Sequence, residues 1–290
     1  MKQKTLELQK LYREGAEILA KAGIEEATLD AWYLLEYATG ISKASYFGNP
    51  YREIEPFQAE QYEGYIRRRS ERIPLQHITG SQEFMGYNFE VNEHVLIPRQ
   101  DTECLVEEAL RFVKSDMKIL DMCTGSGCIL LSILKMAAER KKLSGIQGTG
   151  VDISPDALKV AGRNAERLQI EANLLQSDLF EQVGEEKYSM IVSNPPYIRT
   201  KVIEELQDEV RLHDPWIALD GKEDGLYFYR RIIEKSIEHL TDGGMLLFEI
   251  GHDQGEEVSD LMKKAGYQEI AVKKDLAGLD RVVIGMYNEK

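Results

Sequence analysis

Apolar side chains recur at helical spacing through the first 80 residues. Apolar positions three and four residues apart form one stripe on a helix, so this region is expected to hold three amphipathic helices. Thr28 fits an N-cap, Gly40 a C-terminal stop and Pro56 the first turn of a helix. The predicted inward positions are Leu8, Leu11, Tyr12, Gly15, Ile18, Leu19 and Ala22 in the first helix, Ala31, Leu34, Leu35 and Ala38 in the second, and Ala59, Tyr62, Ile66, Arg69 and Ile73 in the third, which should extend up to Pro74.

Residues 81–98 have a different pattern, in which apolar and polar positions alternate around Gly86 and Asn92. Such alternation, interrupted by turn residues, predicts a β-hairpin. We interpret this segment as a connector between a helical domain at 1–80 and a second domain at 99–290.

Strand and helix patterns alternate from residue 99 onward. This alternation predicts an α/β fold with a parallel sheet, helices on both of its faces, and ligands at the carboxyl ends of the strands. The expected strands are 118–122, 147–152, 173–176, 188–193, 244–250, 267–273 and 281–286, and the expected helices are 102–114, 127–139, 155–168, 224–239 and 254–265.

A glycine-rich turn, DMCTGSGC at 121–128, follows the first of these strands. Gly125 and Gly127 permit a tight turn and a close approach by a ligand, although a turn made only for packing is the alternative. The dinucleotide fingerprint requires a small residue where this chain has Leu130, which disfavours a pyrophosphate. A nucleoside cofactor without phosphates fits better. S-adenosylmethionine is the common one, and Asp121 beside the turn would favour its cationic sulfonium.

Acidic residues follow the next two strands. Asp152 is placed to accept hydrogen bonds from both ribose hydroxyls of a nucleoside. Asp178 could accept from an adenine amino group, with Leu179 and Phe180 as an apolar wall, or it could be an ordinary turn residue. All three strand ends should face one crevice.

The segment Asn194-Pro195-Pro196-Tyr197 follows the fourth strand. Two prolines fix the backbone and remove two N–H donors, which leaves a stiff chain that offers carbonyl acceptors. The Asn194 side-chain oxygen and the Pro195 carbonyl could then hold one NH₂ group, while Tyr197 stacks on a planar amide or base. The alternatives are a plain proline-rich loop and a WW-domain ligand, but the latter requires Pro-Pro-x-Tyr.

Composition narrows the classes of protein. The chain has 290 residues, of which 43% are hydrophobic and 30% charged, as is typical of a globular protein. Its formal charge is −14, and residues 81–290 carry −13 of it, which opposes nucleic-acid binding. Three cysteines without a CxxC and five scattered histidines support neither disulfides nor a metal site. No membrane span or signal peptide is seen, so we expect a cytoplasmic protein.

These motifs together resemble the peptide chain release factor glutamine methyltransferases, the HemK or PrmC family. The resemblance covers nearly the whole chain. The matching segments, in order, are 73–91, 96–110, 121–128, 151–158, 176–180, 191–198, 218–230, 248–255 and 275–283. Asn-Pro-Pro-Tyr and the glycine turn alone would be shared with amino methyltransferases of DNA, whereas the flanking segments are more specific.

The resemblance implies a seven-stranded Rossmann-like methyltransferase domain at 99–290 behind a small helical substrate-recognition domain at 1–80. It implies methylation of the glutamine amide nitrogen in the Gly-Gly-Gln motif of bacterial release factors. The cofactor contacts that it implies, with those argued above, are Asp121, Cys123, Thr124, Gly125, Ser126, Gly127, Asp152, Asp178, Leu179 and Asn194; residues 194–197 would hold the glutamine. Two positions depart from the family pattern: Cys123 replaces a glycine, and in His213-Asp214-Pro215 the residue before the proline is Asp214 where a glutamate is expected.

Two competing functions use the same motifs. An adenine-N6 DNA methyltransferase would present the Asn-Pro-Pro-Tyr segment to a flipped base, but no extra segment resembles a DNA-recognition domain. A nucleoside sensor without turnover would not need two stiffened acceptors. We expect a monomer that binds release factors and forms no stable nucleic-acid complex. The basic cluster Arg67, Arg68, Arg69 and Arg72 is either a solvated helix face or a contact for acidic groups of the release factor.

Overall fold

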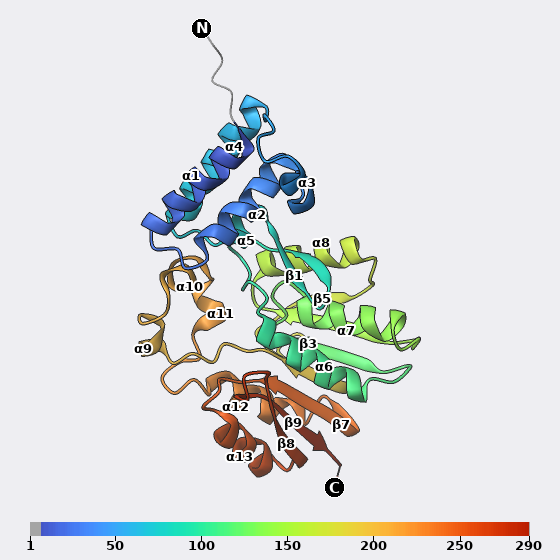
Figure 1. Ribbon diagram of the computed structural model, residues 1–290. Helices are drawn as coiled ribbons and strands as arrows, with labels where there is room; N and C mark the ends of the chain where they lie inside the picture. The colour runs from blue at the N-terminus through green and yellow to red at the C-terminus, as the bar shows by residue number, and fades with distance from the viewer. Residues whose placement is uncertain (1–6, 290) are drawn as a thin grey trace. The chain divides into compact units, whose positions relative to one another are not determined.

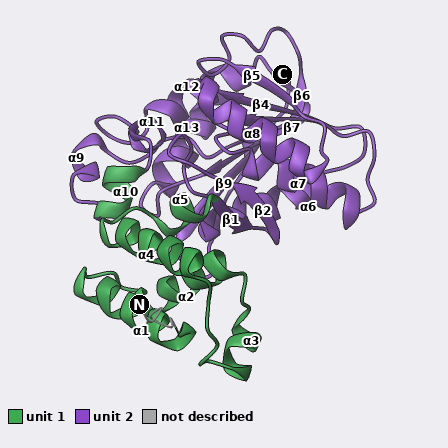
Figure 2. Cartoon of the chain, turned by 90° about the horizontal axis from the view of Figure 1, so that it is seen from above, with its two compact units in different colours: residues 1–80, 208–213 green, residues 81–207, 214–290 purple. Residues whose placement is uncertain are grey.

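The computed structural model describes residues 7–289 (Figure 1). Two compact units make up the chain (Figure 2). The first unit ends at Gly80 and also includes Asp208–His213, and the second contains Ser81–Gln207 and the chain from Asp214 onward.

The first unit is helical. Its own core is built from the buried faces of three longer helices, α1, α2 and α4. Gly15 of α1 leaves space for the Tyr62 side chain of α4, because a Cβ atom there would lie 2.0 Å from the Tyr62 hydroxyl oxygen. The helices are α1 (Leu8–Lys21), α2 (Ala27–Thr39), α3 (Lys43–Gly48), α4 (Pro56–Ser70) and α5 (Leu75–Thr79).

Three local predictions for this unit are wrong. Helix α2 begins at Ala27 with Glu26 in the N-cap position, so Thr28 lies inside its first turn instead of capping it. Ile18 stands at the edge of the α1 stripe and is 47% exposed. Helix α4 ends at Ser70, and Ile73 follows it. Gly40, in contrast, ends α2 in the left-handed conformation that glycine favours.

The second unit begins with a two-stranded antiparallel hairpin, β1 (Ser81–Phe84) and β2 (Tyr87–Glu90). Both turn residues have positive φ, 54° at Met85 and 83° at Gly86, as a tight hairpin turn requires. Phe84 and Phe89 are buried in the core of the second unit. The hairpin therefore belongs to this unit rather than forming a separate connector, and residues 91–98 contain no strand.

A seven-stranded sheet of order β5-β4-β3-β6-β7-β9-β8 forms the centre of the second unit. Strands β3 to β7 run parallel, and β9 is antiparallel to both β7 and β8. The strands are β3 (Lys118–Met122), β4 (Gln147–Asp152), β5 (Asn173–Gln176), β6 (Tyr188–Ser193), β7 (Leu240–Glu249), β8 (Gln268–Lys274) and β9 (Asp280–Tyr287). All seven predicted strands are present.

Helices cover both faces of this sheet, because alternate strand residues point to opposite sides. Ile119 and Met190 pack in one apolar cluster with α6 and α7, whereas Leu120 and Ile191 pack in the other with α12 and α13. The long helices are α6 (Glu103–Phe112), α7 (Cys128–Glu139), α8 (Pro155–Leu168), α12 (Tyr227–Ser236) and α13 (Gly255–Ala265). The short helices of this unit are η1 (Gln100–Thr102), α9 (Thr200–Ile203) and α11 (Trp216–Leu219), whereas α10 (Asp208–His213) belongs to the first unit.

The strand order reverses at β3, which pairs with β4 on one side and β6 on the other. Met122 is level with Val151 of β4 and Ser193 of β6, so these three strands end together. Ligands in open α/β sheets bind in the crevice at such a switch point. None of the helices described in residues 7–289 is both long and apolar enough to cross a membrane.

Candidate functional site

The glycine turn connects β3 to α7 through backbone that favours glycine. Gly125 and Gly127 have φ values of 55° and 79°, and Cys123 also has a positive φ of 65°. A Cβ atom on Gly125 would meet nothing within 4 Å, whereas one on Gly127 would lie 3.0 Å from Leu131 Cδ1. Gly125 therefore faces open space, while Gly127 allows close packing under the turn.

Asp121 lies beneath this turn and is fully buried. Thr124 Oγ1 donates to Asp121 Oδ2 at 2.6 Å, and burial raises the pKa of the carboxyl to about 7. Asp121 and Gly127 are not among the residues that line the pocket, whereas Cys123, Thr124, Gly125 and Ser126 are. The position of Asp121 supports the turn from below, and its predicted cofactor contact stays a prediction.

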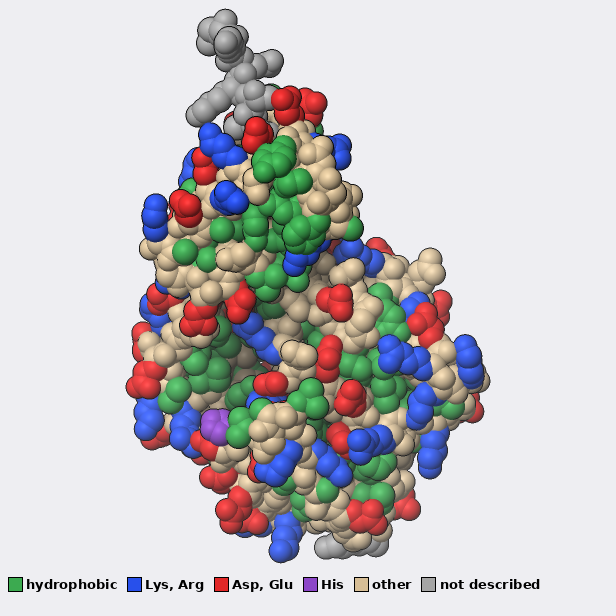
Figure 3. Space-filling model, in the orientation of Figure 1, with side chains coloured by type: hydrophobic (Ala, Val, Ile, Leu, Met, Phe, Trp, Pro, Cys, Tyr) green, Lys and Arg blue, Asp and Glu red, His purple; other side chains and the backbone are tan. Residues whose placement is uncertain are grey.

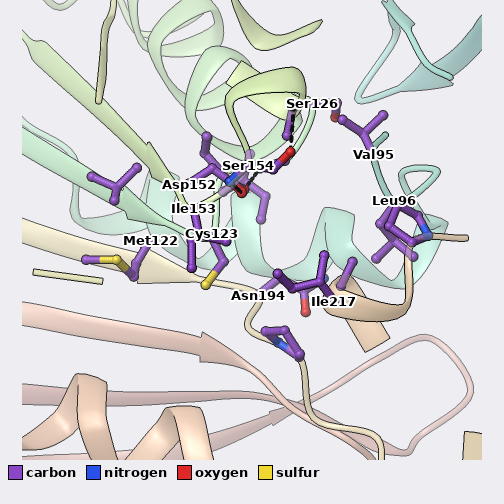
Figure 4. A pocket seen from close by; sticks show the side chains of 18 of the residues that line it. Val95, Leu96, Met122, Cys123, Ser126, Asp152, Ile153, Ser154, Asn194 and Ile217 are labelled. Atoms are coloured by element: carbon purple, nitrogen blue, oxygen red, sulfur yellow. Dashed lines mark hydrogen bonds between the residues drawn. The ribbon is translucent and has the colours of Figure 1, made fainter. Parts of the chain in front are cut away.

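Asp152, at the end of β4, connects the glycine turn to the start of α8. Its Oδ2 accepts from the Gly125 N–H and its Oδ1 from the Ser154 N–H, both at 2.9 Å. Each carboxylate oxygen keeps acceptor capacity, since an ionised carboxylate has about four lone-pair sites. The pKa of the Asp152 carboxyl is raised, because the effect of burial outweighs the lowering by its backbone hydrogen bonds. The side chain lines the pocket, where two acceptor oxygens are available to a diol (Figure 4).

Asp178 and Leu179 follow β5 and both line the pocket. Asp178 Oδ1 accepts from Arg231 Nη1 of α12 at 2.9 Å, so part of its acceptor capacity is already used. Phe180, predicted to join the apolar wall, is instead stacked on His239 with ring centroids 4.7 Å apart and does not line the pocket.

Asn194 and Pro196, which follow β6, line the same pocket. Figure 4 shows the Asn194 side chain beside Cys123 and Ile217, across the pocket from Ser126 and Ser154. Asn194 Nδ2 donates to Thr102 Oγ1 at 3.4 Å. The amide nitrogen therefore faces η1, and Oδ1 is the atom left to accept a hydrogen bond.

Pro195 and Tyr197 are not part of the pocket lining. The Tyr197 hydroxyl donates to Glu249 Oε1 at 3.3 Å, and burial raises the tyrosine pKa. The Tyr197 carbonyl accepts from Gln254 Nε2 at 3.2 Å. A Cβ atom on Gly225 would lie 2.4 Å from the same carbonyl oxygen, so only glycine permits this approach. The contacts with Gln254 and Gly225 fix the backbone of the Asn-Pro-Pro-Tyr motif at Tyr197. The substrate roles of Pro195 and Tyr197 remain predictions.

Two further segments complete the pocket, and local sequence patterns did not single out either of them. One contains His94, Val95, Leu96, Pro98 and Arg99, and the other contains Pro215, Ile217 and Ala218. The first falls partly in the family-like segment 96–110. The second directly follows Asp214, one of the two departures from the family pattern. No group of three or more possible metal ligands is found among the described residues.

The basic cluster on α4 is divided by burial. Arg69 is 5% exposed; its Nε donates to Asp30 Oδ2 and its Nη2 to Glu209 Oε1, each at 2.7 Å. The hypothesis that Arg69 contacts a partner is therefore wrong, because its guanidinium is occupied inside the first unit. Arg67 and Arg68 are exposed. On the face shown in Figure 3, basic and acidic side chains are interspersed.

A glycine turn after β3, an acid after β4 and Asn-Pro-Pro-Tyr after β6, on this sheet order, define a Rossmann-like methyltransferase domain. The chain matches the family model "PrmC N-terminal domain" over residues 10–80 and "Methyltransferase small domain" over residues 100–211. A methyltransferase structure from Pyrococcus furiosus aligns with a TM-score of 0.52 at 17% identity, covering 70% of this chain and 90% of that one, and shows the fold alone.

Two curated relatives cover nearly the whole chain, and both are named release factor glutamine methyltransferase. The protein from Geobacter sulfurreducens is 42% identical over 267 residues, which is 92% of each chain. The protein from Caulobacter vibrioides is 40% identical over 288 residues, which is 98% of each chain. The chain belongs to the release factor glutamine methyltransferase family.

Proposed function

We propose that this enzyme transfers a methyl group from S-adenosylmethionine to the side-chain amide nitrogen of the glutamine in the Gly-Gly-Gln motif of bacterial release factors. One observation carries the proposal. Asn194 lines the same pocket as Gly125 and Asp152, and its Oδ1 is the side-chain atom left to accept, so acceptors for an amide and for a ribose belong to one cavity. Family membership supports the identity of the substrate.

The pocket residues fit this cofactor in their chemistry. The backbone at Gly125 faces open space, and Asp152 offers two acceptor oxygens. Asp178 and Leu179 add an acceptor and an apolar wall for an adenine ring. When bound, S-adenosylmethionine supplies an electrophilic methyl group on a cationic sulfur.

The contribution of Asn194 and Pro195 is to orient the amide. An amide nitrogen is a poor nucleophile because its lone pair is delocalised into the carbonyl group. Two acceptors that hold both of its hydrogens would turn the nitrogen toward tetrahedral geometry and aim its lone pair. Positioning of this kind supplies up to about 7–11 kcal/mol in favourable cases. No strong base is needed, because nitrogen loses its proton readily once it is cationic.

The family relatives favour a protein substrate over DNA. Both relatives reported above carry release factors in their names, and the charge of −13 on residues 81–290 opposes a DNA backbone. We therefore do not propose an adenine-N6 DNA methyltransferase. A release-factor substrate also supports a cytoplasmic site of action. We further propose a monomer, which light scattering at increasing protein concentration would test.

Transfer of labelled methyl groups tests the proposal. The purified protein is offered S-adenosylmethionine with a bacterial release factor, with the same factor carrying Gln→Ala in Gly-Gly-Gln, and with unmethylated duplex DNA. We expect label in the first substrate alone. Label in DNA only, or equal label in both forms of the release factor, would contradict the proposed substrate and site.

A further inference from the structure

A buried carboxylate lies behind the Asn-Pro-Pro-Tyr segment and is not explained by cofactor binding. Glu249, the last residue of β7, is 2% exposed. Its Oε1 accepts from the Tyr197 hydroxyl at 3.3 Å. The Thr102 hydroxyl faces the same carboxylate and lowers its pKa by hydrogen bonding. Asn194 Nδ2 in turn donates to Thr102 Oγ1. Side chains at both ends of the motif are thus connected to one carboxylate.

The direction of these hydrogen bonds follows from the chemistry of each group. An ionised carboxylate only accepts, so in a hydrogen bond between Thr102 and Glu249 the Thr102 hydroxyl is the donor. The Thr102 oxygen can then only accept from Asn194, which requires the Asn194 NH₂ group to point toward it. Glu249 Oε2 has no direct partner within the described residues and retains capacity for this proton. Such contacts are often long without substrate and tighten in the complex.

We propose that Glu249 and Thr102 are positioning residues that fix the Asn194 side-chain amide with Oδ1 toward the pocket. The reverse orientation would present the Asn194 NH₂ group to the substrate NH₂, where two donors repel. Glu249 does not line the pocket, whereas Thr102 does, so Glu249 acts through Thr102. This inference rests on the proposed function, in which Asn194 Oδ1 accepts from the glutamine amide.

The same arrangement makes the orientation of Asn194 depend on pH. Burial raises the pKa of Glu249 to about 7. Once protonated, Glu249 can donate to Thr102, which can then donate to Asn194 Oδ1 and turn the amide around. Two charged groups face Glu249: Arg281 of β9 lowers its pKa, and Asp101 of η1 raises it. The other titratable groups around it are Tyr197, Tyr229 of α12 and Cys128 of α7.

Three variants separate this role from a packing role. Thr102→Val keeps the shape but removes the hydroxyl, Thr102→Ser restores it, and Glu249→Gln removes the charge. For methylation of the release factor, we expect Thr102→Val to lower kcat about tenfold with cofactor Kd within twofold of the parent, and Thr102→Ser to recover most of the rate. The parent kcat should fall as pH drops through about 7, and Glu249→Gln should lose that step.

A second measurement does not require the substrate. The Asn194 side-chain amide protons can be followed by NMR in asparagine-labelled protein, with Asn194→Asp to assign them. We expect one proton that exchanges slowly in the parent and in Thr102→Ser, but rapidly in Thr102→Val. Its chemical shift should change with pH in the parent and not in Glu249→Gln.

The outcomes distinguish this inference from the proposed function. Unchanged kcat, pH profile and amide signals in Thr102→Val and Glu249→Gln would overturn the positioning roles while leaving the methyltransferase activity intact. Failure of the parent enzyme to label any release factor would instead overturn the proposed function, and the NMR comparison would still decide whether Thr102 and Glu249 orient Asn194.

Discussion

The Arg99 guanidinium and the Asp214 carboxylate form an ion pair, with Arg99 Nη2 2.6 Å from Asp214 Oδ2. These residues are 115 positions apart in the sequence. Arg99 lines the pocket, and so does Pro215, which follows Asp214 directly. The pair therefore holds two pocket-forming segments together. The Asp214 side chain is fully buried, whereas that of Arg99 is 44% exposed.

Replacing Asp214 by Ala should loosen the contact between these two pocket-forming segments. Solvent reaches the exposed Arg99 side chain and screens the ion pair. We therefore expect a modest loss of about 1 kcal/mol in unfolding free energy, together with weaker cofactor binding. Asp214→Asn, which keeps a hydrogen-bond acceptor, should retain more of both. Denaturant unfolding and calorimetric titration measure the two effects. Cofactor affinity that is unchanged in Asp214→Ala would show that the pair does not shape the pocket.

Asp152→Ala should weaken cofactor binding by about 1–3 kcal/mol, because ribose hydroxyls lose an acceptor and the Gly125 N–H loses its partner. Titration with S-adenosylmethionine or its demethylated product gives the Kd. Asp156→Ala is the matched control, because Asp156 is exposed on α8 and forms an ion pair with Lys159. The same Kd for both variants would contradict the assignment of Asp152.

Cys123 has a φ of 65°, in a region where residues other than glycine are strained. Cys123→Gly should therefore stabilise the protein by about 1 kcal/mol, seen as a higher midpoint in denaturant unfolding. Cys123→Val should destabilise it, since a β-branched side chain tolerates this conformation least. If Cys123→Gly were the less stable protein, packing of the thiol would outweigh the backbone strain.

Arg69 and Arg67 both lie on α4, but their replacement should change the unfolding free energy by very different amounts. Arg69→Ala leaves Asp30 buried without its partner and should lower the unfolding free energy by about 3–5 kcal/mol. Arg67→Ala, at an exposed position, should change it by less than about 0.5 kcal/mol.

Charge reversal at Arg67 and Arg68 should raise KM for the release factor while kcat stays the same. An unchanged KM would exclude these two side chains from substrate binding.

The sequence predicted the seven strands and the pocket residues Gly125, Asp152 and Asn194, because strand periodicity and turn chemistry are local signals. It also placed Arg69 on the buried stripe of its helix, but not its partners, Asp30 and Glu209. The pocket walls around Arg99 and Pro215 depend on the meeting of distant segments, which no local pattern encodes. Helices α9 to α11 have only four to six residues each, too few for a helical period.

The most direct test is a comparison of cofactor binding and turnover in Asn194→Ala, with Asn173→Ala on the exposed end of β5 as the control. If Asn194 Oδ1 orients the substrate amide, the variant should bind S-adenosylmethionine within a few-fold of the parent Kd. Its methylation of the release factor should fall by about 10²–10³ in kcat, the loss typical of removing one group that stabilises the transition state. Equal losses of binding and turnover, or full activity in Asn194→Ala, would contradict this role.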